Sequence, residues 1–379
     1  MNDKLRKRLA KRKRRLRRRI SIEQGGWQSP MIKPGTNKLE LAERQQAVSC
    51  DGIAMIMQML KTIDLRRSLN ESAKVFKLHL PYDEADHILN IALNTLAGGT
   101  CLDHIEQRRN DEAYLDAVGA QRIPDPTTAG DFCRRFSNQQ LRLVMQGINR
   151  TRQIVWRQQE DSFFNCATIE ADGTMVETYG QKKEGIGMNF KGQWGCHPLV
   201  ITLAETQEVL YLANRSGNRP SHEGSSLYFD LAIKQCREAG FRKIVLRGDT
   251  DFSSTEHLDR WDREGVKFVL GYDANKKLVG IADELPENAW KKLSRKVPST
   301  PPEKRRARPE NPKEAFVVVH GYENQRLQSE SYAEFLYQPD ACDQRYRMVA
   351  VRKDIAVTKG QQFLFDKQRY FFYITNESL

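Results

Sequence analysis

The 379-residue sequence lacks the features of a membrane, secreted or zinc-binding protein. No run approaches the roughly 18 consecutive apolar residues of a membrane-spanning helix. No apolar stretch follows the charged N-terminus, as it would in a signal peptide. The seven cysteines are widely spaced and include no Cys-x-x-Cys pair, which argues against a zinc site and against a disulfide framework. We therefore expect a cytosolic protein.

Basic residues are concentrated at the N-terminus. Residues 1–19 hold twelve lysines and arginines and one acid, Asp3, so they carry +11 of the net charge of +12. Such a block repels itself and predicts a disordered arm over residues 1–36, called the basic arm below. A polyanion is the expected partner, because each neutralised phosphate releases counterions, although a solvated tail is the alternative. The predicted nucleic-acid contacts are Lys4, Arg6, Lys7, Arg8, Lys11, Arg12, Lys13, Arg14, Arg15, Arg17, Arg18 and Arg19.

Residues 37–160 predict a helical domain that either binds DNA or forms a packed scaffold. Apolar residues recur three and four positions apart in residues 52–61 and 84–96, and residues 138–157 form a longer amphipathic pattern. Thr128 has the residue type of a helix N-cap and is followed three positions later by Asp131.

From about residue 165 the pattern becomes one of strands and helices in the order β-β-β-α-β-α-β. This order predicts an α/β domain over residues 161–294, with a mixed sheet that begins as a three-stranded meander. The expected strands are 166–172, 198–204, 209–214, 243–246 and 267–270, and the expected helices are 227–239 and 255–264.

A proline-rich stretch separates this domain from a β-rich end. Residues 295–313 contain five prolines and predict an extended linker. Residues 314–379 predict a β-rich segment, with strand-like runs at 316–320, 333–337, 346–351 and 370–374.

Two aspartates stand at the ends of predicted strands. Asp172 ends the first strand and Asp249 directly follows the fourth, and we expect these strands to be neighbours at the centre of the sheet. Two adjacent carboxylates repel unless a cation lies between them. Mg²⁺ fits, because it is hard and combines one or two carboxylates with substrate phosphate. A lone aspartate after a strand is more often a turn residue or a helix cap, so the hypothesis depends on the pair.

Two other acids compete for the same site. Asp251 lies two residues after Asp249, and Glu170 lies two residues before Asp172 on the same face of its strand. The tripeptide of residues 247–249, Arg-Gly-Asp, also occurs in cell-adhesion proteins, but no other feature of the sequence indicates secretion.

Several short motifs together resemble bacterial insertion-sequence transposases of the DDE group 1 type, which have a ribonuclease-H-like core. Each motif is weak alone, but the set is specific and covers about residues 37–379. The motifs are IEADGT (169–174), YGQKKEG (179–185), GQWGCHPL (192–199), SGN (216–218), RGDTDF (247–252) and, in the helical part, LAGG (96–99) followed by Asp103.

The resemblance implies a function and a site. Asp172 would be the first catalytic aspartate and Asp249 the second, with Mg²⁺ or Mn²⁺ as cofactor. The substrates would be the inverted-repeat ends of the element and its target DNA, bound by a homo-oligomer in the bacterial cytoplasm, at the nucleoid. The β-rich segment resembles an insertion that precedes the helix carrying the third catalytic acid, a glutamate.

The third acid cannot be assigned from the sequence. No helix is predicted after Ile374, and Glu377 does not match the family motif, so we expect a chain truncated before the catalytic helix. Metal-dependent cleavage and strand transfer at insertion-sequence ends is the first hypothesis. A truncated protein that binds the ends without catalysis is the second. A general nucleic-acid-binding protein with structural carboxylates is the third.

Overall fold

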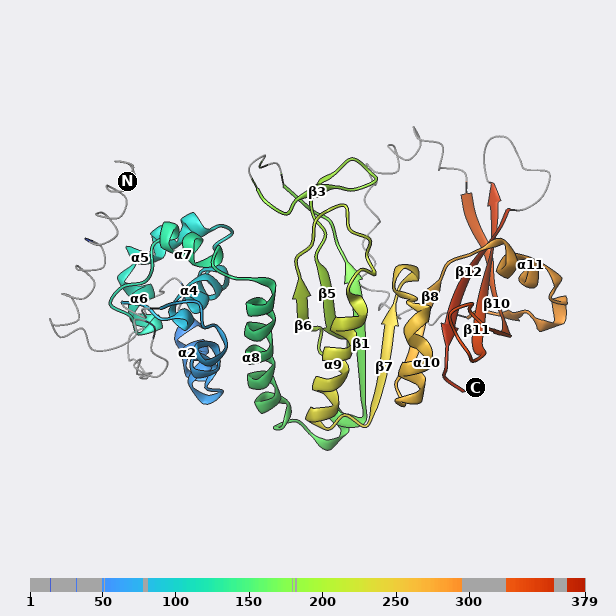
Figure 1. The fold of residues 1–379 in the computed structure, drawn as a ribbon, viewed down its shortest axis with the longest axis horizontal. Helices are drawn as coiled ribbons and strands as arrows, with labels where there is room; N and C mark the ends of the chain where they lie inside the picture. The colour runs from blue at the N-terminus through green and yellow to red at the C-terminus, as the bar shows by residue number, and fades with distance from the viewer. Residues whose placement is uncertain are drawn as a thin grey trace, which may run out of the picture. The chain divides into compact units, whose positions relative to one another are not determined.

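The computed structural model describes residues 14, 32, 50, 52–77, 81–178, 180, 183–294, 325–357 and 367–378 (Figure 1). Most of the predicted basic arm, the predicted linker and the strand expected at 316–320 lie outside these residues. The chain divides into two compact units, residues 1–159 and 160–379. Within the described ranges, no helix combines the length and the apolar character needed to cross a membrane.

The first unit is helical. Its core contains the buried side chains of Met57, Leu69, Leu93, Ile105 and Tyr114, which come from five different helices. The helices predicted at 52–61, 84–96 and 138–157 are confirmed. The helices are α2 (Gly52–Thr62), α3 (Leu65–Ser72), α4 (Glu84–Leu96), α5 (Ile105–Arg109), α6 (Glu112–Val118), α7 (Pro126–Cys133) and α8 (Asn138–Trp156), with a 3₁₀ turn η1 (Leu102–His104).

The predicted N-cap at Thr128 is wrong. The cap of α7 is Asp125, whose carboxylate accepts hydrogen bonds from the backbone N–H of Thr128 at 2.8 Å and from its hydroxyl at 2.8 Å. Pro126 occupies the first turn, where its missing N–H leaves no hydrogen bond unmade. The helix therefore begins three residues earlier than the residue type of Thr128 suggested.

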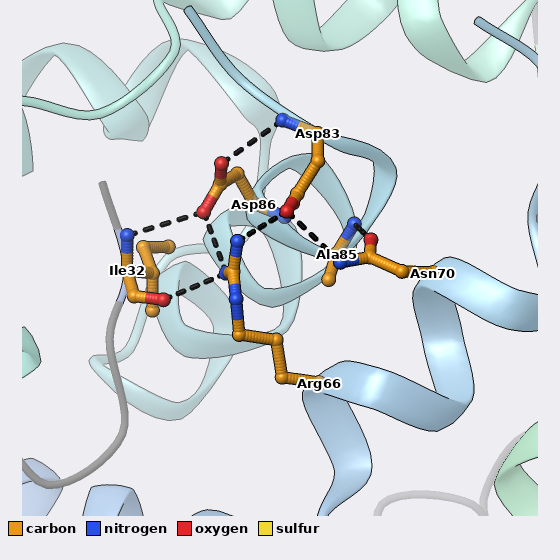
Figure 2. A network of polar contacts seen from close by, with 6 residues as sticks. All are labelled: Ile32, Arg66, Asn70, Asp83, Ala85 and Asp86. Atoms are coloured by element: carbon orange, nitrogen blue, oxygen red, sulfur yellow. Dashed lines mark hydrogen bonds and ion pairs between the residues drawn. The ribbon is translucent and has the colours of Figure 1, made fainter. Parts of the chain in front are cut away.

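A buried ion network joins α3 to the start of α4 (Figure 2). The fully buried carboxylate of Asp86 accepts hydrogen bonds from Arg66 at 2.8 Å and from the backbone N–H of Ile32 at 3.1 Å. Arg66 also donates to the carbonyl of Ile32 at 2.7 Å and forms an ion pair with Asp83. Burial raises the pKa of Asp86, and the charge of Arg66 opposes that rise. Arg66 thus keeps a buried carboxylate paired.

The second unit is built on a large mixed sheet with helices, as predicted. Its described strands form a nine-stranded sheet in the order β6-β5-β1-β7-β8-β12-β11-β10-β9. β1 pairs antiparallel with β5, which pairs antiparallel with β6, whereas β1–β7 and β7–β8 are parallel pairs. The predicted element order is present as β1 (Cys166–Gly173), β5 (Leu199–Leu203), β6 (Glu208–Ala213), α9 (Ser225–Ala239), β7 (Lys243–Gly248), α10 (Leu258–Arg263) and β8 (Lys267–Tyr272).

Four later strands, β9 to β12, extend this sheet beyond β8. β12 pairs antiparallel with β8, so that Ile374 lies opposite Leu270. The strands expected at 333–337, 346–351 and 370–374 are confirmed, but no pattern in the sequence indicated that they pair with the core strands. The remaining elements are η2 (Asp161–Asn165), η3 (Thr250–Phe252), η4 (Thr255–His257), α11 (Lys276–Glu284), η5 (Glu287–Ala289), β9 (Lys291–Lys292), β10 (Gln325–Tyr337), β11 (Tyr346–Val357) and β12 (Lys367–Thr375).

The two faces of β1 differ in burial. Ala167, Ile169 and Ala171 are buried on the face that α9 contacts. Figure 1 shows α9 lying along the strands of the large sheet. Successive side chains of a strand alternate between faces, so Glu170 and Asp172 lie on the opposite face. The packing of α9 therefore decides to which side these acids point.

A small second sheet lies beyond the end of the large one toward which β1 and β7 run (Figure 1). We call it the ribbon. It consists of β2 (Val176–Glu177), β4 (Trp194–Cys196) and β3 (Gly187–Met188), paired antiparallel in that spatial order.

Replacement of Arg66 by alanine should destabilise the first unit. The change leaves the carboxylate of Asp86 buried without its cation, which typically costs about 3–5 kcal/mol. Urea denaturation would measure the free energy of unfolding. The loss should shrink as the pH falls, because protonation of Asp86 removes the buried charge.

The matched control is Arg67→Ala on the same helix. Arg67 is 74% exposed and pairs with Glu71 at 2.9 Å, a solvent-exposed ion pair of the kind that contributes little to stability. Equal destabilisation by the two substitutions would contradict the role assigned to the buried network.

Candidate active site

Asp172 and Asp249 lie side by side at the carboxyl end of the large sheet. In the parallel pair of β1 and β7, Ala171 lies opposite Gly248, and Asp172 and Asp249 are the residues that directly follow these two in the chain. Both are exposed. The prediction that their strands are neighbours is confirmed. Residues that lie opposite each other in a parallel pair point to the same face, so the carboxylates of Asp172 and Asp249 point to the same face of the sheet.

The backbone that carries Asp249 is tightly packed. Its carboxylate accepts a hydrogen bond from the N–H of Asp251 at 3.0 Å and caps η3. A Cβ on Gly248 would lie 2.8 Å from the Cβ of the fully buried Phe252. A Cβ on Gly271, in β8, would lie 2.6 Å from the backbone nitrogen of Thr250. The turn after Asp249 can therefore rest on β7 and β8 only because both positions are glycine.

The backbone that follows Asp172, at the end of β1, is also closely packed. Its Oδ1 accepts a hydrogen bond from the N–H of Gly173 at 2.8 Å. A Cβ on Gly173 would lie 2.9 Å from Cε1 of His197, so the imidazole packs against the backbone that follows the aspartate. The carbonyl of His197 accepts a hydrogen bond from Nε of Arg215 at 3.0 Å.

Negative charge accumulates around Asp249. Partial desolvation by the neighbouring backbone is the largest cause of a raised pKa at this residue, and the N–H of Asp251 opposes the rise. The charges of Asp251, Asp172 and Asp273 raise the pKa further. Asp273 directly follows β8, the next parallel strand after β7, and was not among the predicted site residues. The placement of Asp172 and Asp249 at strand ends was the signal that could have found it.

Glu170 is engaged elsewhere. It lies opposite Arg247 in the register of β1 and β7, and the two side chains form an ion pair. Glu170 was predicted to compete for the site. Its carboxylate instead pairs with Arg247, and both residues lie two positions before the aspartates on their strands.

A cavity of about 1100 Å³ opens at this end of the sheet. Gly173 and Thr250, which directly follow the two aspartates, line it together with Asp251, Asp273 and His197. Asp172 and Asp249 themselves are not among the lining residues. Other walls come from the ribbon, from the loop between β6 and α9, and from the segment that runs from η3 into η4.

Asp172 and Asp249 fit a hard divalent cation whose other ligands come from water and substrate phosphate. In the described ranges, no group of three or more His, Cys, Asp or Glu side chains is arranged to hold a metal ion. Asp172 and Asp249 are of the residue type that Mg²⁺ takes beside phosphate and water, namely one or two carboxylates. The third acid stays unassigned, since Glu170 is paired and Glu377 forms an ion pair with Lys243. Of the predicted basic-arm contacts, only Arg14 is described, and it is exposed.

Comparison with known proteins assigns the family. The family of transposase DDE domains, group 1, matches residues 35–366, so the chain belongs to this family. Its members are DNA transposases of the DDE class, and their domains use divalent metal ions. No curated protein matches the chain.

Seven chains of known structure match. One is a piggyBac transposase in a synaptic complex with hairpin DNA, solved by cryo-EM, with a TM-score of 0.35 and 10% sequence identity. The match covers 89% of this chain and 63% of that chain, so the present chain spans less than two thirds of that transposase. A likeness of this level shows nothing about function.

Substitution of Gly271 by alanine should destabilise the second unit. The new methyl group would meet the backbone of Asp249 and Thr250 at 2.8 and 2.6 Å, and backbone atoms cannot move aside cheaply. We expect a loss of about 1–3 kcal/mol in the free energy of unfolding, measured by urea denaturation.

Gly280→Ala is the control in the same unit. Gly280 lies within α11, and a Cβ there would have no neighbour within 4 Å. Alanine should leave the stability unchanged or raise it by about 0.5–1 kcal/mol, because it favours the helix. A stable Gly271→Ala protein would mean that the turn after Asp249 has room to move.

Proposed function

We propose that this chain is an insertion-sequence transposase that cleaves the ends of its DNA element and joins them to target DNA. In this proposal, residues 161–294 form a ribonuclease-H-like catalytic core, and Asp172 and Asp249 are its metal-binding acids. The observation that carries the proposal is the parallel register of β1 and β7, which puts the two carboxylates next to each other at an exposed edge.

The chain's own residues would hold a divalent ion and position the DNA strand. Asp172 and Asp249 would bind Mg²⁺ or Mn²⁺, both hard ions suited to carboxylate oxygens. Such an ion, when bound, neutralises charge during an in-line displacement at phosphorus. The N–H of Asp251 fixes the carboxylate of Asp249, and Gly248 and Gly271 let that carboxylate approach Asp172.

DNA binding would involve the basic arm and the helical unit as well as the catalytic core. The basic arm would contact phosphates without reading sequence. The helical unit, residues 37–160 of the sequence prediction, would contribute further contacts at the element ends. A homo-oligomer would bring two ends together, because joining both requires more than one catalytic site. The bacterial nucleoid would be the place of action.

A second candidate function is binding of the element ends without catalysis. It is favoured by one observation, namely that the described residues contain no group of three side chains arranged for a metal ion. A chain of this kind would occupy the ends and compete with an active transposase.

Asp172→Asn and Asp249→Asn should each abolish cleavage while leaving DNA binding intact. Each change removes a metal ligand but keeps the shape of the side chain. We expect the cleavage rate to fall by about 100-fold or more, because even the partners of metal ligands contribute roughly 10–100-fold. The assay uses linear DNA carrying both ends of the encoding element, Mg²⁺ or Mn²⁺, a denaturing gel for nicks and a mobility shift for binding. Asp251→Asn and Asp273→Asn, tested alongside, would show whether either acid acts as the third ligand.

Glu238→Gln on α9 is the matched control, since Glu238 is 57% exposed and its carboxylate lies 3.8 Å from the ammonium of Lys234, away from the candidate site. Its cleavage rate should equal that of the unaltered chain. Bound but uncut DNA with the unaltered chain would support the second candidate function. Cleavage unchanged in both asparagine variants would sink the proposed site.

Removal of residues 2–19 should weaken DNA binding and reduce its salt dependence. The deleted segment carries twelve lysines and arginines. Each phosphate that the chain no longer neutralises lowers the slope of log K against log salt by about 0.9. Fluorescence anisotropy titrations at several salt concentrations measure this slope. An unchanged slope would show that the basic arm does not contact DNA.

A further inference from the structure

The turn that joins β3 to β4 is braced by its own hydrogen bonds. Oδ1 of Asn189 accepts from the N–H groups of Lys191 at 2.9 Å and Gln193 at 3.0 Å. Its Nδ2 donates to Oε1 of Gln193 at 2.8 Å. Two backbone bonds, each of 3.0 Å, close the turn, and Gly192 has a φ of +78°. Residues 189–193, called the ribbon tip, therefore form a turn whose conformation does not depend on Phe190.

Phe190 is presented to solvent at this braced turn. Its side chain is 93% exposed, far more than the other large apolar residues of the ribbon, Val176, Met188 and Trp194, which are 50–52% exposed. The Lys191 ammonium lies 5.4 Å from the ring centroid. Exposure of a whole phenyl ring is unfavourable in water, and the turn gains nothing from it. A flat apolar ring beside a cation is suited to a ligand that has both a flat face and negative charge.

The ribbon is also fixed to the rest of the unit. The N–H of Gly217 donates to the carbonyl of Gly195 at 3.0 Å, and a Cβ on Gly217 would lie 2.3 Å from the carbonyl oxygen of Gly187. The loop that contains Gly217 and the ribbon thus touch backbone to backbone. Since Gly217 and Asn218 line the cavity, the ribbon tip has a fixed place beside it.

The ribbon tip and the candidate site share one cavity. Phe190 and Lys191 line the same space of about 1100 Å³ as Gly173 and Thr250, the residues that follow Asp172 and Asp249. A strand whose phosphodiester lies at the two aspartates would therefore have its neighbouring nucleotides within the space that Phe190 borders.

We propose that Phe190 stacks against an unpaired nucleobase of the DNA strand at the cleavage site, and that Lys191 contacts an adjacent phosphate. The proposal rests on the proposed function for the identity of the strand. Every base offers a flat π face, so one ring serves any sequence. The occupant is nucleic acid rather than protein, because the ring stands beside the ammonium of Lys191 and both residues line the cavity of the candidate site.

The test uses the full chain and a forked DNA whose unpaired end contains 2-aminopurine, a base whose fluorescence falls on stacking. A fully paired duplex of the same sequence is the comparison. The titrations are done at raised salt, which weakens the phosphate contacts of the basic arm. Ca²⁺ replaces Mg²⁺ so that the DNA is bound without being cut. Phe190→Ala should weaken binding of the forked DNA by roughly 5- to 100-fold and remove the quenching. Its affinity for the paired duplex should stay within about twofold, since only an unpaired base reaches the ring.

Phe190→Trp should restore both the affinity and the quenching, because indole is also a flat aromatic ring. Lys191→Ala should lower the salt slope by about one. The control is Leu336→Ala, which removes a 67%-exposed apolar side chain on β10 and should change nothing. Phe190 has almost no buried surface, so its replacement should not unfold the chain.

Two outcomes overturn the stacking proposal. One is binding and quenching by Phe190→Ala equal to those of the unaltered chain. The other is an equal loss with Leu336→Ala. The proposed function fails separately, if Asp172→Asn cuts element-end DNA at the normal rate. Because the forked DNA is titrated without cleavage, the two failures are distinguishable.

Discussion

The parallel pairing of β1 with β7 is the constraint on which the second unit depends. Two parallel strands cannot be joined by a tight turn, so the chain must leave the end of β1 and return to the start of β7. β5, β6 and α9 lie on that path, and α9 contacts both strands. The same pairing brings the carboxyl ends of the strands to one edge. Asp172 and Asp249 are adjacent because of this backbone geometry, in spite of their mutual repulsion.

Backbone packing, rather than a neighbouring cation, holds Asp172 and Asp249 close together at the carboxyl end of the sheet. Glycine at positions 248 and 271 lets the turn after Asp249 rest on the sheet, and Phe252 anchors that turn in the core. The nearby cation, Arg247, is directed instead to Glu170. Desolvation raises the pKa of Asp249, and the like charges of Asp251, Asp172 and Asp273 raise it further. An arrangement of this kind favours binding of a cation, since a cation relieves repulsion that the fold itself does not.

The sequence predicted those features that short-range patterns determine. Strand order and the positions of Asp172 and Asp249 follow from apolar runs and the residues that end them, and the same rule applied to β8 would have found Asp273. The cap of α7 was assigned wrongly because residue type was weighed without Pro126. The contact of Arg66 with Ile32 and Asp86, and the pairing of β12 with β8, join segments 20 to about 100 residues apart. No local periodicity signals such pairs.

The concentration of carboxylates at the sheet edge bears on how a DNA strand could bind there. Asp172, Asp249, Asp251 and Asp273 carry like charges, which repel phosphate unless a cation is bound beside them. Stacking of a base on an aromatic ring does not depend on net charge. An exposed ring that lines the same cavity would therefore supply affinity that the negative charge of the acids does not oppose. In this proposal Phe190 and the acids have complementary roles. Phe190 would hold the base, and the acids would hold the phosphodiester through a bound cation.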